Sequence, residues 1–329
     1  MKRFLLLFVL CFFISSCDDG SVDQVSFTFN DSLAGVCRSG TSAFFIQKTQ
    51  DNRAIIIQVP ESNFQNRLTA DLPVQPQPLT INGSSIRLIY REYSGPITGT
   101  ILCSVIPEAE PVVTREREAT AGTLRITTTA IKTEPNADGV TQITHFLHTL
   151  TFSDLTFDLG EGNTQVNEQI APIQFQTPAT SFTNFSGLPG VESCTNDNTV
   201  LFKYQVDQSL VLDLSDADFA TLFSSEPGPK SVLFSDSTRL KHTFYNTTIN
   251  TLSDTYFCSN PLPALPPVIE EFQAVNGILN QSGIIQVTTL PSTNGFKHTI
   301  VLLNVRLANG SLTRQLGNSF IFGEFETSN

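Results

Sequence analysis

The chain has 329 residues, of which 40% are hydrophobic and 15% charged, a composition too apolar for an intrinsically disordered protein. Its 31 acidic and 19 basic residues give a net charge of −12 at pH 7, which excludes the basic footprint that nucleic-acid binding requires. The same acidity disfavours attraction to anionic lipid headgroups, so we expect any membrane contact to come through an anchor.

The first residues have the order of a secretory signal peptide. Lys2 and Arg3 supply the positive charge, an apolar run extends from Phe4 to Ile14, and Ser15-Ser16 precede Cys17. The run has 11 residues, whereas a transmembrane helix needs about 20. The pattern therefore predicts a cleaved signal over residues 1–16.

The tetrapeptide Ile14-Ser15-Ser16-Cys17 resembles the lipobox of a bacterial lipoprotein. The resemblance implies cleavage before Cys17, a diacylglycerol thioether on its sulfur, and acylation of the new amino group by a fatty acid such as palmitate. Several acyl chains form a stable anchor, where one alone is marginal. The alternative is an ordinary signal peptide cleaved elsewhere, which would leave Cys17 as a thiol.

Residues 17–24 begin Cys17-Asp18-Asp19-Gly20 and form a short acidic linker. This start resembles the export signal of Bacteroidota surface lipoproteins. The resemblance implies an outer-membrane lipoprotein, with the cell surface favoured over the periplasmic face. Removing Lys2 and Arg3 with the signal leaves 17 basic against 31 acidic residues, so the mature chain carries a net charge of −14.

An internal repeat divides the rest of the chain. Residues 43–58 reappear as 200–213, and the C-terminal Phe175-Gln176-Thr177 reappears as Phe325-Glu326-Thr327. Self-similarity of this extent indicates a tandem duplication. We therefore predict two homologous domains of ordinary size, a first repeat at 25–178 and a second repeat at 179–329.

The repeat also selects a disulfide pattern. Four cysteines remain after the signal and the lipidated residue are set aside, and four cysteines allow three pairings. An offset of 155 residues aligns Cys103 with Cys258, and equivalent pairs are expected to bond equivalently in an oxidising compartment. The prediction is one bond in each repeat, Cys37–Cys103 and Cys194–Cys258.

The periodicity within each repeat is that of strands. Runs rich in β-branched residues and bounded by Gly, Pro, Asn or Asp predict strands; they include residues 54–59, 85–91, 123–128 and 298–306. Ser215 with Asp218 three positions later resembles a capping box and predicts a short helix, with its counterpart at 60–64. We expect an all-β fold of two tandem β-sandwiches, immunoglobulin-like or jelly-roll-like, each with one short helix. Two lipocalin-like β-barrels are the alternative.

Few motifs in the sequence indicate a chemical activity. No nucleophile elbow, zinc-protease motif or phosphate-binding loop occurs in the sequence, so we predict no catalytic residue and no cofactor. His148 and His298 occupy matching apolar positions, which predicts a structural role. His145 and His148 are three apart on a predicted strand and so fall on opposite faces. His242 has no acidic neighbour in the sequence.

Two acidic clusters are candidate sites. Asp213, Asp216 and Asp218 could suggest Ca²⁺, but they lack the Gly and Glu of an EF-hand loop, and we favour helix capping for them. Asp154, Asp158 and Glu161 form the close carboxylate trio of the first repeat, the arrangement that a carboxylate-based hydrolase would need.

Glycan-related candidates are few. The chain has no Trp, 5 Tyr and 26 Phe, whereas sugar platforms need exposed flat aromatic rings. Tyr90, Tyr93 and Tyr245 could line a site, although strand packing is the default for each. Ser32 and Ser237 follow an aspartate and match a short O-glycosylation motif of Bacteroidota, and a plain turn is the alternative for both.

Three functions are compatible with these observations. The favoured one is a non-enzymatic envelope protein that acts as a binding, adhesion or spacing module for a protein or glycan ligand. The second is a carrier of an apolar small molecule or lipid. The third is a secreted carboxylate-based hydrolase.

Overall fold

The structure is a computed structural model in which strands dominate. Twenty strands, three short α-helices and two 3₁₀ helices occur in the described part of the chain, which confirms the predicted all-β fold. The predicted signal 1–16, Cys17 and the linker 17–24 lie outside the described residues. The described residues are 27–39, 43–104, 106, 108–160, 163–167, 170–182, 185, 190–194 and 197–328.

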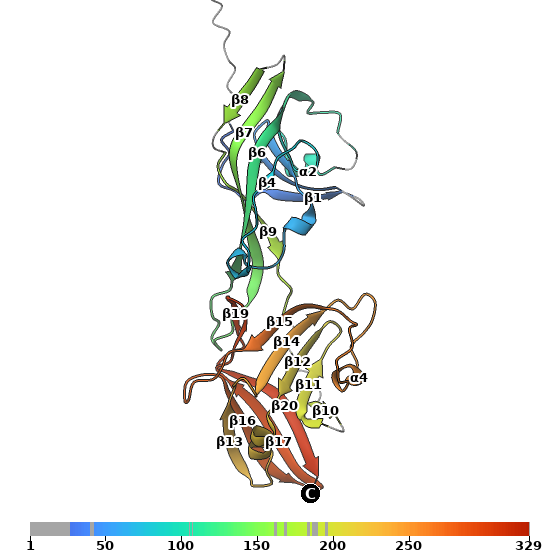
Figure 1. Ribbon diagram of the computed structural model, residues 1–329, viewed down its shortest axis with the longest axis vertical. Helices are drawn as coiled ribbons and strands as arrows, with labels where there is room; N and C mark the ends of the chain where they lie inside the picture. Colours follow the sequence, from blue (N-terminus) through green and yellow to red (C-terminus); the bar gives the residue numbers. More distant parts are fainter. Residues whose placement is uncertain are drawn as a thin grey trace, which may run out of the picture. The chain divides into compact units, whose positions relative to one another are not determined.

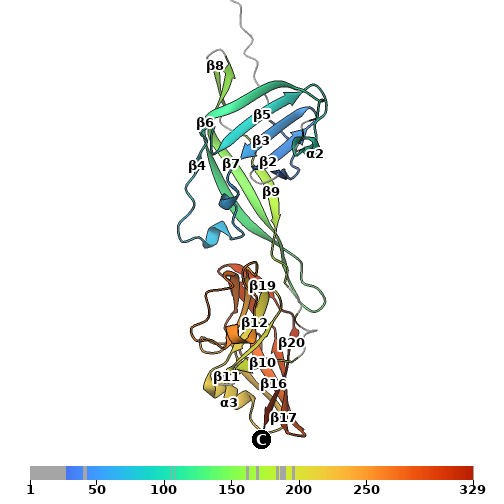
Figure 2. The ribbon, with the colours of Figure 1, turned by 90° about the vertical axis from the view of Figure 1, so that its right-hand side faces the viewer.

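The strands of the first repeat form one antiparallel sheet with the order β1-β2-β3-β5-β6-β7-β8, in which β4 also pairs with β6 and β9 with β7. Figure 2 shows β2, β3 and β5 side by side. The strands are β1 (Gly35–Ser39), β2 (Ala43–Gln50), β3 (Arg53–Gln58), β4 (Leu79–Thr80), β5 (Arg87–Tyr93), β6 (Val113–Lys132), β7 (Ile143–Gly160), β8 (Asn163–Asn167) and β9 (Ile173–Pro178).

Aromatic side chains connect strands β5 and β7 of this sheet. The ring of Phe27 stacks on Phe157 of β7, with centroids 4.4 Å apart, and meets Tyr90 of β5 edge-on at 5.2 Å. All three side chains are buried. Offset stacks and edge-on contacts are the preferred aromatic geometries, so Phe27 connects β5 with β7, which β6 separates in the sheet.

The second repeat has two sheets. One has the order β10-β11-β12-β14-β15-β18-β19 and the other β13-β16-β17-β20, and they are seen as separate groups of strands in Figure 1. The strands are β10 (Glu192–Cys194), β11 (Asp197–Tyr204), β12 (Gln208–Asp213), β13 (Gly228–Leu233), β14 (Arg239–Tyr245), β15 (Val268–Ala274), β16 (Ile284–Ser292), β17 (Gly295–Leu303), β18 (Arg306–Asn309), β19 (Leu312–Gln315) and β20 (Ser319–Ser328).

The two sheets of the second repeat share one core. Leu210 and Phe244 from the first sheet and Val287 and Ile300 from the second belong to a single cluster of buried side chains, as in a β-sandwich. In the described part of the chain the end strands of each sheet do not pair with each other, so the sheets are open. The lipocalin-like alternative does not hold for these residues.

The chain forms two compact units whose bounds differ from those of the sequence repeats. The first unit contains the described parts of residues 1–60, 79–124 and 151–172, and the second contains 61–78, 125–150 and 173–329. The long strands β6 and β7 contribute to both units. The division of the sequence at 178 and 179 therefore stays a prediction.

The strand pairing of the first repeat recurs in the second, with an offset of 155 residues for β6 and β15 and of 152 residues for β5 and β14. Arg91 of β5 pairs with Glu116 of β6, and Thr243 of β14 pairs with Glu271 of β15. Both ladders then shift register one step later, between Glu92 and Tyr93 and between Phe244 and Tyr245. Side chains at equivalent positions of the two repeats therefore lie on the equivalent face of each sheet.

One predicted strand is interrupted. Residues 298–306 were expected to be continuous, but β17 ends at Leu303 and β18 begins at Arg306. Asn304 lies between them with φ of 50°, and its counterpart Asp154, 150 positions earlier, has φ of 55°. Asn and Asp are the non-glycine residues that adopt this left-handed conformation most readily. Strand β7 continues through Asp154, whereas β17 ends before Asn304.

The predicted helix of the second repeat is present as α3 (Asp216–Leu222). Ser215 caps it by accepting a hydrogen bond from the backbone N–H of Asp218 at 3.2 Å. Its counterpart in the first repeat is a single 3₁₀ turn, η1 (Glu61–Asn63), and η2 (Thr69–Asp71) follows. In the described part no helix is long and apolar enough to cross a membrane.

The expectation of one short helix per repeat is incomplete. A further turn of α-helix precedes the second cysteine of each pair, α2 (Gly99–Leu102) and α4 (Asp254–Phe257). Disulfide bonds join Cys37 to Cys103 and Cys194 to Cys258, across sequence separations of 66 and 64 residues. This confirms the predicted pairing and ties each helical turn to its sheet.

Candidate functional site: a groove beside the Cys194–Cys258 disulfide

A groove of about 580 Å³ lies on the second repeat, beside the disulfide. Its floor comes from β11, β12, β14 and β15, and its wall comes from the end of α4 and the loop that follows. The lining residues are Cys194, Asp197, Val200, Val211, Asp213, Lys241, Thr243, Tyr245, Phe257, Cys258, Ser259, Asn260, Leu262 and Glu271.

Strand alternation places these side chains in the groove. Leu210 and Leu212 of β12 point into the sandwich core, so Val211 and Asp213 between and beyond them face the other side of the sheet. On β14, Leu240 belongs to the core while Lys241 lines the groove. The groove is therefore the outward face of a sheet whose inward face is the core.

The wall of the groove is held by aromatic packing. Phe257 of α4 stacks on Phe202 of β11 with centroids 4.7 Å apart, and Tyr256 contacts Tyr245 edge-on at 5.6 Å. The three groups Phe202, Tyr256 and Phe257 are buried in a small cluster with Cys194. This packing, together with the disulfide, fixes the distance between the wall and the floor.

Polar groups with unfilled bonding capacity face the groove. In the described part of the chain, neither the Lys241 ammonium nor the Asp213 carboxylate forms an ion pair, and both residues line the groove. The Glu271 carboxylate accepts hydrogen bonds from the Thr243 hydroxyl at 3.3 Å and the Gln273 amide at 2.9 Å. Burial raises the pKa of Tyr245 to about 12, so its hydroxyl is neutral.

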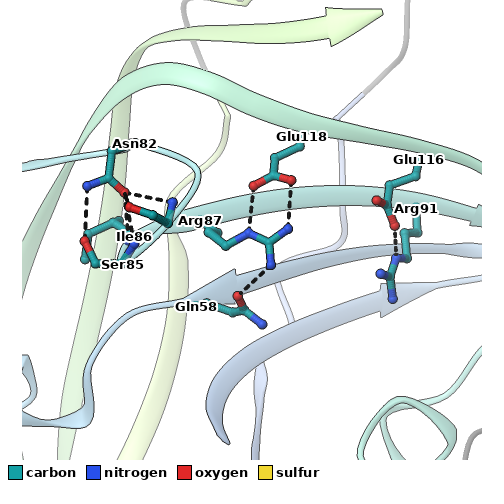
Figure 3. Close-up of polar contacts among 9 residues, drawn as sticks. Gln58, Asn82, Ser85, Ile86, Arg87, Arg91, Glu116 and Glu118 are labelled. Carbon is teal, nitrogen blue, oxygen red and sulfur yellow. Dashed lines mark hydrogen bonds and ion pairs between the residues drawn. The ribbon is translucent and has the colours of Figure 1, made fainter. Parts of the chain in front are cut away.

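The equivalent face of the first repeat is occupied by ion pairs (Figure 3). Arg87 of β5 donates two hydrogen bonds to the Glu118 carboxylate, at 2.7 and 2.8 Å, and one to Gln58. Arg91 donates to Glu116 at 2.6 Å. The bidentate geometry of Arg87 is the stronger kind of charged contact.

The strand registers show what differs in the second repeat. Arg91 and Glu116 are paired in the ladder of the first repeat, and Thr243 and Glu271 are paired in that of the second. The second repeat thus keeps the glutamate and replaces its arginine partner with a short hydroxyl side chain. The carboxylate of Glu271 is left without a cationic partner within ion-pair distance among the described residues.

The two matching histidines make the same contacts in both repeats. His148 lies between the hydroxyls of Thr128 and Thr177, 2.9 Å from each. The Thr177 hydroxyl donates to Asn66, so it accepts from Nε2–H of His148, and Nδ1 accepts from Thr128. Burial lowers the pKa of His148 to about 4. A neutral ring that makes two hydrogen bonds suits the predicted structural role.

His298 repeats this geometry, at 2.9 Å from Thr289 and 2.9 Å from Thr327. Burial, with a smaller effect of Lys230, lowers its pKa. His145 is exposed on the face of β7 opposite the buried His148, as strand spacing predicts.

The remaining aromatic and histidine candidates are buried. Tyr90 donates to Glu92 at 2.9 Å, and burial raises the pKa of its hydroxyl to about 12. Tyr93 is also buried and is not among the residues that line the groove. His242 is bonded to Gln208 through Nε2 at 3.1 Å, and burial lowers the pKa of His242 to about 3.

The predicted acidic cluster of the second repeat separates into different roles. Asp213 faces the groove. Asp218 accepts hydrogen bonds from Ser215 and Thr238 at the start of α3, which is the favoured capping role, and Asp216 is exposed in the first turn. No cluster of three or more metal-ligating side chains occurs among the described residues.

The other candidates lie on turns and strand surfaces. Asp154 and Asp158 are exposed, and Asp158 accepts from the backbone N–H of Gly160 at 2.7 Å. Glu161 lies outside the described residues. Ser32 and Ser237 are exposed in turns, and their hydroxyls contact Asn30 and Ser235.

No family model matches the chain, and no similar curated protein or solved structure was found. The groove was not predicted from the sequence. The signal that could have found it is the exchange of Arg91 for Thr243 at equivalent positions, which becomes visible when strand register is added to the repeat.

Proposed function

We propose that the protein is a lipid-anchored protein of the cell envelope that binds a ligand non-enzymatically through the groove of its second repeat. The lipobox-like tetrapeptide ending at Cys17 supports the anchor. The observation that carries the binding role is the loss of the arginine partner of Glu271, which leaves a polar groove open where the first repeat has an ion pair.

The charges of the groove favour a basic protein segment as its ligand. Three carboxylates, those of Asp197, Asp213 and Glu271, line it together with one ammonium group, that of Lys241. A ligand that carries Lys or Arg and an apolar residue would meet the carboxylates and the aliphatic wall at Leu262. The net charge of the chain would also accelerate encounter with such a ligand.

A glycan is the less favoured ligand. Stacking on a sugar needs an exposed ring, whereas Tyr245 and Phe257 are only 5% and 8% exposed. The hydroxyl and amide groups of Ser259 and Asn260 line the groove and could still bond a sugar. The two ligand classes are therefore separated by experiment.

The first prediction concerns charge in the groove. We expect full-length chain to bind the fluorescent peptide Lys-Leu-Lys-Leu-Lys more tightly than Ser-Leu-Ser-Leu-Ser, and we expect chitohexaose to bind weakly. Asp213→Asn and Glu271→Gln should each lower the affinity for the basic peptide about fivefold to tenfold, since a charged contact is worth about 1 to 1.5 kcal/mol. Fluorescence anisotropy at two salt concentrations measures the effect.

The control for these variants is Glu326→Gln, which removes an exposed charge on β20 outside the groove. It should leave peptide affinity within about twofold, because screened surface charges contribute little. If chitohexaose bound more tightly than the basic peptide, the ligand class would be a glycan and not a protein segment. If groove and control variants behave alike with both probes, the proposed function is wrong.

The second prediction concerns the anchor. Cys17→Ala removes the sulfur that would carry the diacylglycerol, so we expect the chain to move from the membrane fraction to the soluble fraction of an expressing cell. Protease added to intact cells should degrade the wild-type chain if it is displayed at the surface. A Cys11→Ala variant, changed within the signal, should fractionate as the wild type does. Unchanged fractionation of Cys17→Ala would exclude the lipid anchor.

A further inference from the structure

A second pocket, of about 440 Å³, contains a buried cation. It lies in the second compact unit and shares no lining residue with the groove. Its lining residues are Asn136, Asp138, Val140, Thr141, Gln142, Phe182, Arg314, Gln315, Leu316, Ser319, Phe320 and Ile321.

Arg314 of β19 is the buried cation. It is only 4% exposed, and its Nε–H has no hydrogen-bond partner. Its guanidinium carbon lies 4.1 Å from the ring centroid of Phe272, 5.4 Å from that of Phe244 and 5.6 Å from that of Phe182. The Nε–H is therefore buried without an acceptor, and the guanidinium carbon lies over three aromatic rings.

No carboxylate of the described residues lies within ion-pair distance of this guanidinium. Glu270 is near enough to interact electrostatically, and burial raises the pKa of Glu270. His242, the other ionisable neighbour, is held neutral because burial and the charge of Arg314 lower its pKa to about 3. Burial lowers the pKa of Arg314 itself to about 10, so it remains charged at neutral pH.

A buried charge without hydrogen bonds is costly, and native proteins pair such groups. Ring faces attract a cation but accept no conventional hydrogen bond. The five N–H groups of an arginine match the two oxygens of a carboxylate in a planar, bidentate arrangement. Because Arg314 lines the pocket, an oxyanion there could accept hydrogen bonds from its terminal N–H groups.

The rest of the lining limits the kind of anion. Val140, Leu316, Phe320 and Ile321 are apolar, and Asp138 adds a negative charge. With one cation and one carboxylate in its lining, the pocket disfavours a dianion such as phosphate or sulfate. The apolar walls favour a ligand with an aliphatic group. We propose that this pocket binds a small organic carboxylate with an aliphatic group, and that Arg314 holds its carboxylate.

Two kinds of ligand carry a carboxylate next to an aliphatic group: a fatty acid and the C-terminus of an apolar peptide. Titration calorimetry of the full chain with decanoate against decanol represents the first kind, and N-acetylleucine against N-acetylleucinamide represents the second. In at least one pair we expect the carboxylate to bind about tenfold or more tightly than its neutral analogue, since charge-assisted bidentate bonds are the stronger kind. Equal affinities within both pairs would overturn the proposal.

Replacing Arg314 disturbs the core, so the decisive variant is at the exposed rim. Ile321 lines the pocket and is 59% exposed. Ile321→Glu should lower the affinity for the preferred carboxylate about tenfold relative to Ile321→Gln, because like charges repel across a short distance. Leu290→Glu, at a 57% exposed position of β16 outside the pocket, should have no effect. Equal binding by the Ile321 variants would also overturn the proposal.

Discussion

Replacing Cys194 and Cys258 with alanine is expected to lower the free energy of unfolding by about 4 kcal/mol, because the bond closes a long loop whose entropy the unfolded chain otherwise retains. The sequence separation is 64 residues. The same change should abolish binding of the basic peptide, since the wall of the groove at α4 loses its covalent link to β10. Urea unfolding followed by circular dichroism and peptide anisotropy measure the two effects.

The matched control is the first disulfide. Cys37→Ala with Cys103→Ala opens a loop of nearly the same length, 66 residues, and should lower stability by a similar amount. The groove lies wholly on the second repeat, so peptide binding should persist in this variant. If both double variants lost binding equally, general destabilisation would explain the result and the groove would not.

Lowering the pH from 7 to 4 is expected to destabilise the chain through its buried histidines. His148 has a pKa of about 4 when folded and about 6.5 when unfolded. Between these values the unfolded state binds more protons, so stability is fully present above pH 6.5 and is lost as the pH falls. His148 alone accounts for about 3 kcal/mol, at about 1.4 kcal/mol for each pH unit of difference.

His148→Gln tests this explanation. Glutamine can bond a threonine hydroxyl without titrating, so the variant should be less stable at pH 7 but should lose less stability between pH 7 and 4. His145→Gln, on the exposed side of the same strand, should keep the pH dependence of the wild type. Urea midpoints at several pH values provide the comparison. A parallel decrease in all three proteins would contradict the role assigned to His148.

The fold was largely predictable because the sequence contains two versions of it. Matching cysteines selected one disulfide pattern from three, and Ser215 with Asp218 marked a helix start that the structure confirms. The interrupted strand at Asn304 was missed, because a single left-handed residue leaves the β-branched pattern around it intact. The turns α2 and α4 were missed because a four-residue helix has too few positions to show a periodicity.

The candidate sites were harder to predict, since each depends on which residues of different strands become neighbours. Lys241 and Glu271 are 30 positions apart, and their common face follows from strand register. Arg314 gives no signal in the sequence, because an arginine on a short strand is ordinarily solvated. Its burial depends on three rings that come from separate segments, Phe182, Phe244 and Phe272.

The ladder that pairs Arg91 with Glu116 and Thr243 with Glu271 is built from main-chain hydrogen bonds. An outward side chain can therefore change without moving the strands that carry it. The first repeat therefore carries an ion pair at a position where the second carries a hydroxyl group, although the strands of both pair in the same way. Comparing the two repeats position by position thus identifies surface positions whose chemistry differs while the strand pairing is unchanged.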